Sequence, residues 1–346
     1  MRIQQIQKQI KKLKLGAVLI SKPENVFYLC GFLGSNGQLF ITPNKATLIT
    51  DFRYFRVARK QLVKGVKVYD QKKGLKGLVG KIKIIGIEEA YITIAQLKGL
   101  KKALKGVNFK PTDYMVEKMR MIKDEEEMKI IKRGVKIMEK TLADFRKTMR
   151  VGQGEEEMSW KLLSIAKKNG AEGFSFPPII CFGKNTADVH HQVENNKLKK
   201  GEKVLVDFGI KYKNYCTDMT RVFYLYKSKG NGIEQKMYST VFEANRAAIR
   251  AIKVGEKFSD IDKAARSVIK KAGYGKYFGH ATGHGIGLKV HEHPAVSEAS
   301  NEVVEPGMVF TIEPGIYIEG KGGIRIENML YVSQKGKVEV LTKFEY

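Results

Sequence analysis

Hydrophobic positions in the first 113 residues alternate between a strand period and a helix period. Short runs rich in β-branched residues predict strands, and segments with apolar residues every three or four positions predict helices. The expected strands are Gly16–Ile20, Gln38–Thr42, Ala46–Asp51, Val66–Tyr69 and Lys81–Ile87, and the expected helices are Ile3–Leu13, Tyr54–Leu62 and Ile94–Leu104. This alternation predicts an α/β domain built around a central sheet.

A long amphipathic helix is predicted over Lys123–Arg150. Its apolar face consists of Met128, Ile131, Val135, Met138 and Leu142. Asp124 has the chemistry of an N-cap, and Glu127 three residues later completes the pattern of a capping box. Two glycines then separate this helix from a second one, expected over Glu155–Lys168.

Beyond residue 176 the pattern is dominated by strands. The expected strands are Ile179–Phe182, Lys203–Phe208, Thr217–Tyr224, Met308–Glu313 and Ile324–Tyr331, and two helices, Gly232–Ile252 and Ser259–Ala272, interrupt them. The arrangement predicts an α+β domain in which helices cover the back of a sheet. We therefore expect two domains, residues 1–115 and 116–346, with the boundary between residues 110 and 125.

Length and composition narrow the class of protein. A chain of 346 residues exceeds the usual size of one domain, and 43% hydrophobic with 29% charged residues is typical of a soluble globular protein. No apolar run approaches the ~20 residues that cross a bilayer, and the first residues lack the features of a signal peptide. Three cysteines without CxxC spacing predict buried, reduced thiols and a cytoplasmic location.

The net charge of +27 is concentrated near the N-terminus. Residues 1–120 contain 25 Lys and Arg against 7 Asp and Glu, a net charge of +18. Such a charge attracts nucleic acid, but the lysines are spread over helices and loops without an RNA-binding signature or a basic stripe interleaved with aromatics. Solvated lysine faces are the preferred interpretation, and specific nucleic-acid binding is disfavoured. The alternative to an enzyme is a basic binding module that has no catalytic activity.

The strongest chemical signal is a set of side chains of metal-ligand type. The set is Asp207 in VLVDFGI, Asp218 in YCTDMTRVFYL, His284 in HATGHGIGLKVHEHP, Glu313 in TIEPGIY and Glu327 in GGIRIEN. All six histidines lie inside or just before this block. Four carboxylates and one imidazole suit a pair of hard-to-borderline divalent ions, not a zinc–thiolate site. Solvated carboxylates with core histidines are the alternative.

Asp207 and Asp218 are expected to lie close together. A tight hairpin over the intervening KYKN segment would place them directly opposite each other, with Cβ atoms ~5 Å apart. Two such carboxylates would raise each other's pKa, and a divalent ion between them would remove the repulsion. The apolar residues around both predict burial, although a solvent-facing pair is the alternative.

The neighbours of the other ligand candidates add to the pattern. Glycines on both sides of His284 permit close backbone approach to a ligand, and His280 and His291 flank it. Arg325 and Glu327 are two residues apart and would share one face of a strand. An arginine there can orient a metal-bound carboxylate or bind a product carboxylate, whereas an ordinary surface ion pair is the alternative.

These segments resemble the pita-bread metallopeptidases, and specifically their aminopeptidase P and prolidase branch. The matching segments are VHHQV, VLVDFGIKYKNYCTDMTRVFYL, GHATGHGIGLKVHEHP, EPGMVFTIEPGIYI and GGIRIEN. Upstream, PENVFYLCGFLGSNGQLFITPNKATLITDFRY is similar to the N-terminal domain of the same branch. The resemblance covers nearly the whole chain. It implies a creatinase/prolidase-like α/β N-terminal domain followed by an α+β pita-bread catalytic domain.

The resemblance also implies a ligand set and roles for its neighbours. Asp218 and Glu327 would bridge two metal ions, Asp207 would complete one, and His284 with Glu313 the other. Manganese is the first expectation, with cobalt, iron or zinc as alternatives. The positions that contact substrate or transition state in the family correspond here to His190, His280, His291, Tyr317 and Arg325.

The reaction implied is hydrolysis of an Xaa-Pro bond at a peptide N-terminus by a metal-activated hydroxide, with Glu313 moving the proton. Two departures stand out: Asp188–Val189 precedes His190 where the family often has Leu-Pro, and Ala295 stands where several dipeptide-restricted relatives carry an arginine. We therefore expect an Xaa-Pro aminopeptidase, with Xaa-Pro dipeptidase (prolidase) as the close alternative. The expected partners are peptides with proline second and another copy of this chain in a homodimer.

Overall fold

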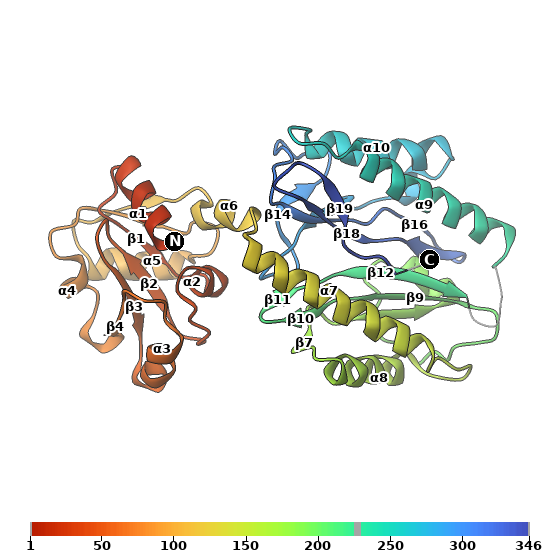
Figure 1. The fold of residues 1–346 in the computed structure, drawn as a ribbon, viewed down its shortest axis with the longest axis horizontal. Helices are drawn as coiled ribbons and strands as arrows, with labels where there is room; N and C mark the ends of the chain where they lie inside the picture. The colour runs from red at the N-terminus through yellow and green to blue at the C-terminus, as the bar shows by residue number, and fades with distance from the viewer. Residues whose placement is uncertain (1, 225–229, 345–346) are drawn as a thin grey trace. The chain divides into compact units, whose positions relative to one another are not determined.

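The computed structural model describes residues 2–224 and 230–344. The chain divides into two compact units, Met1–Arg120 and Met121–Tyr346 (Figure 1). The domain boundary predicted after residue 115 falls at the start of helix α6 (Met115–Met121). None of the helices within the described ranges has the length and apolar character needed to span a bilayer.

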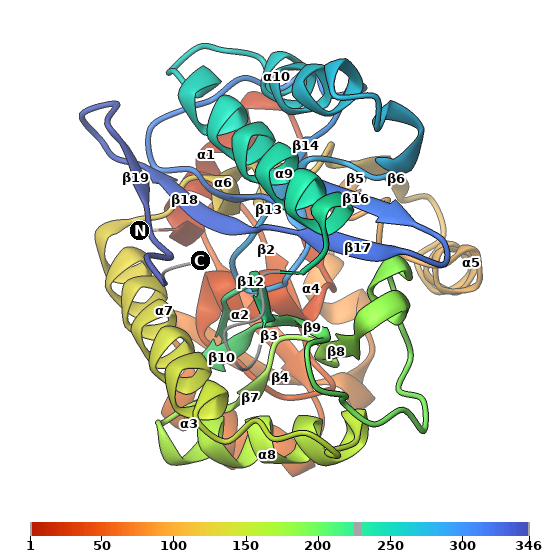
Figure 2. The same ribbon diagram turned by 90° about the vertical axis from the view of Figure 1, so that its right-hand side faces the viewer.

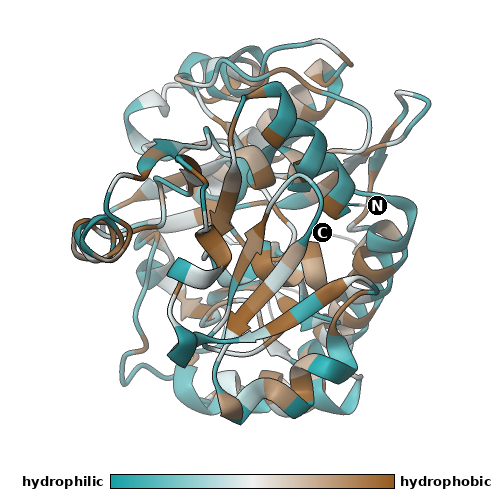
Figure 3. Ribbon diagram, turned by 90° about the vertical axis from the view of Figure 1, so that its left-hand side faces the viewer, coloured by the Kyte–Doolittle hydropathy of each residue, from teal (hydrophilic) through white to brown (hydrophobic). Residues whose placement is uncertain are grey.

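The first unit is built on a mixed six-stranded sheet with the order β4-β3-β2-β1-β5-β6. Its strands are β1 (Ala17–Ile20), β2 (Gln38–Ile41), β3 (Ala46–Thr50), β4 (Val66–Asp70), β5 (Ile84–Ile87) and β6 (Asn108–Pro111). Its helices are α1 (Arg2–Lys12), α2 (Pro23–Cys30), α3 (Phe55–Gln61), α4 (Lys76–Val79) and α5 (Ile94–Ala103). Figure 3 shows hydrophobic residues concentrated along the central strands, as expected of a sheet covered by helices.

The five strands predicted in this unit are present, but three elements were missed: helices α2 and α4 and strand β6. Helix α2 is too short for its apolar period to be read, although Pro23 at its start and the left-handed Gly31 at its end mark both limits. Strand β6 is an edge strand whose residues are mostly exposed, so it lacks an apolar run. Helix α4 is only four residues long, so all three missed elements carry little hydrophobic signal.

Two helix pairs enclose the sheets of the second unit. Helices α9 (Gly232–Ala251) and α10 (Phe258–Lys271) lie on one side, and α7 (Glu125–Arg146) and α8 (Glu155–Lys168) lie on the other (Figures 1 and 2). The predicted capping box at the start of α7 is confirmed, because Asp124 accepts from the backbone N–H of Glu127 and Glu127 accepts in return. The predicted apolar face of α7 is buried.

The strands of this unit form four small sheets, ordered β11-β10-β7, β12-β9-β8, β14-β13-β15-β18-β19 and β16-β17. Their bounds are β7 (Gly173–Phe174), β8 (Ile179–Phe182), β9 (Lys203–Phe208), β10 (Ile210–Tyr212), β11 (Tyr215–Cys216), β12 (Met219–Tyr224), β13 (Gly283–Gly285), β14 (Glu292–Val296), β15 (Val309–Ile312), β16 (Gly315–Ile318), β17 (Gly322–Arg325), β18 (Asn328–Val332) and β19 (Val338–Val340). The three cysteines are buried, as predicted.

Two predicted strands differ from the structure at a ligand candidate. The strand expected over Thr217–Tyr224 begins only at Met219, as β12, which leaves Asp218 between β11 and β12. The strand expected over Ile324–Tyr331 is divided into β17 and β18, and the break contains Glu327. The expectation that Arg325 and Glu327 share one strand is therefore wrong. Neither interruption contains a glycine or a proline, so the sequence pattern does not mark it.

The predicted pairing of Asp207 with Asp218 is also wrong. In the β9–β12 ladder, Asp207 lies opposite Thr220. The reason is the turn, in which Tyr212 pairs with Tyr215 and the two residues between them, Lys213 and Asn214, have φ values of 47° and 68°. The register is displaced by two residues from the prediction. Because side chains alternate with a period of two, such a displacement keeps the same faces together.

Candidate active site

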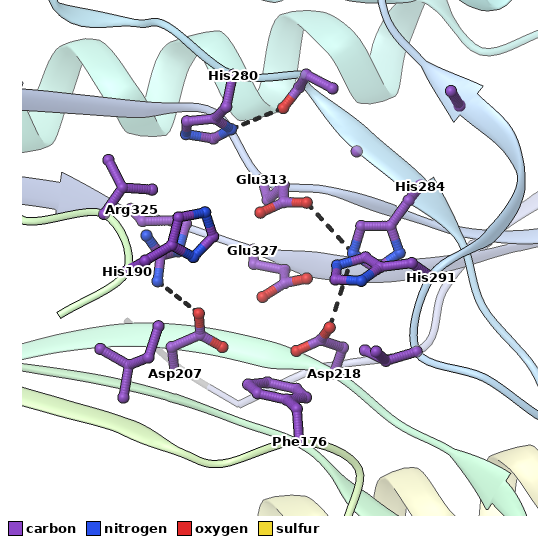
Figure 4. A pocket seen from close by; sticks show the side chains of 16 residues that line it. Phe176, His190, Asp207, Asp218, His280, His284, His291, Glu313, Arg325 and Glu327 are labelled. Atoms are coloured by element: carbon purple, nitrogen blue, oxygen red, sulfur yellow. Dashed lines mark hydrogen bonds and ion pairs between the residues drawn. The ribbon is translucent and has the colours of Figure 1, made fainter. Parts of the chain in front are cut away.

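The four predicted carboxylates gather where strands end. Asp207 lies on β9, Asp218 between β11 and β12, Glu313 directly after β15, and Glu327 between β17 and β18 (Figure 4). All four line a cavity of about 320 Å³. The other residues lining it are Phe176, Ile179, Val189, His190, His280, Ala281, Gly283, His284, Val290, His291, Ala295 and Arg325. The structure thus gathers every predicted site residue around this cavity except Tyr317, which contacts two of the lining residues.

His284 lies at one side of the acidic cluster, beside two of its carboxylates (Figure 4). Its Nε2 atom lies 3.7 Å from Asp218 Oδ2 and 3.3 Å from Glu313 Oε1. Ligand atoms of Asp218, His284 and Glu327 lie within 4.8 Å of one another, close enough to share an ion. The glycines on either side are required, because a Cβ atom at Gly283 would lie 2.0 Å from the Thr311 carbonyl oxygen. Only the histidine side chain of this strand can therefore project into the cavity.

The His284 ring is neutral and presents a lone pair to the cluster. Burial is the main cause that lowers its pKa to about 3, and the neighbouring His291 lowers it further. Its Nδ1 atom lies 3.1 Å from the carbonyl oxygen of Gly285, which can only accept a hydrogen bond. The proton of the neutral ring is therefore on Nδ1, and Nε2 is free to bind a cation.

Three buried oxygens of the cluster have no hydrogen-bond partner within the described part of the chain: Asp207 Oδ1, Asp218 Oδ1 and Glu327 Oε1. Burial and the neighbouring carboxylates raise the pKa of Asp218 and of Glu327 well above the ordinary values. Burial also raises the pKa of Glu313 to about 8. Crowded, unpartnered oxygen donors beside a neutral imidazole are the donor set that divalent cations require, so the residues present fit metal ions.

Arg325 is buried and links three elements of the site. Its Nη2 atom donates to Asp207 Oδ2 at 2.5 Å and its Nε atom to Thr220 Oγ1 at 3.1 Å. Its Nη1 atom donates to the Tyr317 hydroxyl at 2.9 Å. The Thr220 hydroxyl in turn donates to Glu327 Oε2 at 2.8 Å. Each guanidinium nitrogen is thus already engaged within the protein.

Thr220 is a site residue that the sequence analysis missed. It connects the Arg325 guanidinium with the Glu327 carboxylate and is fully buried. A signal was available, because a residue two positions after Asp218 on a strand faces the same side. The apolar wall formed by Phe176, Ile179 and Val290 was also missed. No charge, spacing or period distinguishes those three residues from ordinary core positions.

His280 and Tyr317 form an ordered hydrogen-bond chain that starts at Arg325. His280 Nδ1 lies 2.8 Å from the Ala281 carbonyl oxygen, so the ring proton is on Nδ1. Its Nε2 atom, 3.0 Å from the Tyr317 hydroxyl, then accepts a hydrogen bond from it. Burial lowers the pKa of His280 to about 4 and raises that of Tyr317 to about 12, so both stay neutral at physiological pH.

The remaining histidines separate into two groups. His190 and His291 line the cavity, and the ring of His291 stands edge-on to that of His284 with centroids 4.3 Å apart. His293 instead lies 3.2 Å from Glu302, and His191 lies 2.8 Å from Glu155. The clustering of histidines in the sequence therefore overstates the number that face the cavity.

Comparison with known families agrees with this geometry. Residues 129–334 match the model of metallopeptidase family M24, and residues 2–122 match the creatinase/prolidase N-terminal domain. The chain belongs to metallopeptidase family M24. It is a hydrolase whose family depends on divalent metal ions, and the predicted family, the predicted pita-bread fold and the expected metal dependence are confirmed.

The chain resembles relatives named for two activities, dipeptidase (prolidase) and aminopeptidase, over almost its full length. The Xaa-Pro dipeptidase of Pyrococcus horikoshii is 34% identical over 349 residues, covering 99% of this chain and 97% of that protein. The crystal structure of the prolidase from Pyrococcus horikoshii superposes with a TM-score of 0.94 at 33% identity, covering 99% and 98% of the two chains. The X-Pro aminopeptidase from Thermotoga maritima superposes with a TM-score of 0.89 at 35% identity, covering 97% and 98%.

Proposed function

We propose that this metallopeptidase hydrolyses the bond between an N-terminal residue and a following proline, as an Xaa-Pro aminopeptidase. The observation that carries the proposal is the set of unpartnered oxygens of Asp207, Asp218 and Glu327, buried beside a neutral His284. Relatives named for Xaa-Pro substrates support the choice of bond. A non-catalytic binding module is disfavoured, because it would not need to keep such a costly group of buried acids.

The proposed site holds two divalent ions through Asp207, Asp218, His284, Glu313 and Glu327. Ligand atoms of Asp218, His284 and Glu327 lie within 4.8 Å of one another, and the family resemblance implies that Asp218 and Glu327 would serve both ions. Manganese is the first candidate, and cobalt, iron or zinc accept the same oxygen and nitrogen donors. Bound ions would lower the pKa of a water molecule and polarise the scissile carbonyl group.

The side chains around the cavity would handle protons and charge. Glu313 would take a proton from the attacking water through a carboxylate oxygen and return it to the leaving proline nitrogen. His291 and His190 face the cavity and would donate hydrogen bonds to the carbonyl oxygen as its negative charge grows. The Arg325–Tyr317–His280 chain would hold Asp207 and His280 in fixed orientations.

We infer a preference for peptides of three or more residues. A strict dipeptidase needs a positive group that binds the carboxylate directly after proline. Arg325 is the only Lys or Arg among the described residues that line the cavity, and each of its nitrogens already donates within the protein. Ala295, which also lines the cavity, offers no charge.

Xaa-Pro dipeptidase remains the second candidate, and the likeness to the Pyrococcus horikoshii prolidase favours it. The decisive experiment compares kcat/KM for an Xaa-Pro dipeptide and an Xaa-Pro-Yaa-Zaa peptide, with manganese or cobalt supplied to metal-stripped protein. We expect faster cleavage of the longer peptide and no cleavage without metal. A tenfold or larger preference for the dipeptide would establish the second candidate. Metal-independent cleavage would contradict the proposed site.

Assembly and location stay predictions. We propose a homodimer in the cytoplasm, on the family resemblance and the reduced, buried cysteines. Sedimentation velocity across a range of protein concentrations tests the dimer, and a single species of 39.1 kDa throughout would contradict it.

A further inference from the structure

Two adjacent histidines of the loop after β8 point in different directions. His190 is exposed and lines the active-site cavity, whereas the His191 side chain is 3% exposed and does not line that cavity. His191 Nε2 lies 2.8 Å from Glu155 Oε2, and the Glu155 side chain is fully buried. No role in the reaction follows for either His191 or Glu155 from the metal site described above.

Glu155 is suited to hold a loop in place. It is the first residue of α8, where the unpaired N–H groups of the helix favour a negative charge. The same oxygen that contacts His191 also accepts from the backbone N–H of Glu194 at 2.8 Å. One buried carboxylate therefore fastens two points of the loop to the start of a helix.

The far end of the loop is fastened to the same place. The backbone N–H of Gly152 donates to the Leu198 carbonyl at 2.8 Å, and the N–H of Leu198 donates to the Gln153 carbonyl at 2.9 Å. Near the cavity the loop is held by fewer hydrogen bonds. Among the described residues, His190 makes one, from its N–H to Asp188 Oδ1 at 3.2 Å. The contact between His191 and Glu155 is the buried tie nearest to His190.

We propose that Glu155 and His191 are positioning residues that hold His190 in the active-site cavity. Because Glu155 holds the His191 side chain, the preceding residue, His190, is kept at the cavity. The inference rests on the proposed function, because it assumes that His190 acts on the peptide substrate. Displacement of an acting group by ~1 Å can cost about a hundredfold in rate, which is why such a tie matters.

The test uses the metal-loaded full chain and the variants Glu155→Gln and His191→Ala. We expect kcat/KM for an Xaa-Pro-Yaa-Zaa peptide to fall at least tenfold in His191→Ala and less in Glu155→Gln, which keeps the side-chain volume. Metal content per chain should stay unchanged, because the loop supplies no metal ligand. In a His190→Ala background, adding His191→Ala should cause no further loss, since both changes remove the same contribution.

Glu156→Gln is the matched control. Glu156 lies in the same first turn of α8 but is exposed, so its replacement should leave kcat/KM unchanged. Amide hydrogen exchange over residues 188–198 supplies a readout that needs no activity, and it should accelerate in His191→Ala and not in Glu156→Gln.

The outcomes separate the two hypotheses. Unchanged exchange in His191→Ala would overturn the anchor, as would additive losses in the His190→Ala background. Faster exchange with unaltered kcat/KM would overturn the positioning role while leaving the proposed function intact. A wild-type chain that cleaves no Xaa-Pro peptide would overturn the proposed function, and the exchange data would still show whether the anchor exists.

Discussion

At the scale of single residues, the site depends on carboxyl groups that are largely buried at the wall of the cavity. Asp218 and Glu327 are almost fully buried, and each has an oxygen without a partner in the described structure. Isolated buried charges are costly, so without metal these groups bind protons. Their charge and their chemistry therefore depend on whether metal ions replace these protons.

The variant Glu313→Gln tests the proposed proton carrier. An amide cannot take a proton from water, so we expect kcat to fall by about 10²- to 10⁴-fold. The fold should be unaffected, because the change conserves shape. The measurement is kcat for an Xaa-Pro-Yaa peptide at saturating metal, with circular dichroism and metal content as controls. Turnover within tenfold of the wild type would show that another group moves the proton.

The pH dependence of stability follows from the same residue. Its pKa rises from an ordinary 4.5 to about 8 in the folded, metal-free protein, so between these values the folded state binds more protons than the unfolded state. Stability must then decrease as pH rises across this window. We expect the Tm of metal-free protein to fall between pH 5 and pH 8. Added manganese should raise the Tm more at pH 8 than at pH 5. A Tm that rises with pH in the chelated sample would contradict the burial of this group.

At the scale of elements, the β10–β11 turn sets which residues meet. Lys213 and Asn214 both adopt positive φ, the conformation that a two-residue hairpin turn requires. The turn fixes the ladder that continues into β9 and β12, and hence the place of Asp207 relative to Thr220. A local conformation thus determines the spacing of acids in the cavity.

Substitutions at Asn214 test this link. Glycine tolerates positive φ, so Asn214→Gly should leave the free energy of unfolding nearly unchanged. Alanine does not, so Asn214→Ala should cost about 1–2 kcal/mol. Urea unfolding followed by circular dichroism measures both. Equal stability of the two Asn214 variants would show that the turn is not strained.

The sequence predicts elements with a strong period far better than it predicts where strands stop. Helix α7 with its capping box and the strands of the first sheet follow from apolar spacing. The breaks at Asp218 and Glu327 do not, because no glycine or proline marks them. The identities of the acids followed from their motifs, whereas Phe176 depends on tertiary contacts that no local pattern encodes.

At the scale of the whole molecule, the site residues all belong to the second unit. The described cavity is lined by residues from Phe176 to Glu327, and residues 1–120 form a separate compact unit. A ligand that binds only the folded state of one unit stabilises that unit by mass action. Metal should therefore affect the two units unequally.

Chelation of metal tests this asymmetry. We expect hydrogen exchange in β9, β13 and β18 to accelerate when metal is removed, while exchange in β1 and β2 stays the same. Scanning calorimetry should show a lower transition temperature for the unit that holds the site. Equal acceleration in both units would mean that they unfold together and that metal binding stabilises the entire chain.

The unpartnered oxygens have a consequence for how such a chain changes under selection. Replacing Asp218 or Glu327 by a neutral side chain of similar size removes a buried group that prefers water. The variant should resist heat better than the wild type when both are free of metal, but it can no longer bind its metals. Durability and activity therefore conflict at these positions. A variant library selected for heat resistance alone, without metal, should accumulate Asn, Gln or apolar residues there first. If both acids are retained over many generations, selection must be acting on the metal-dependent activity.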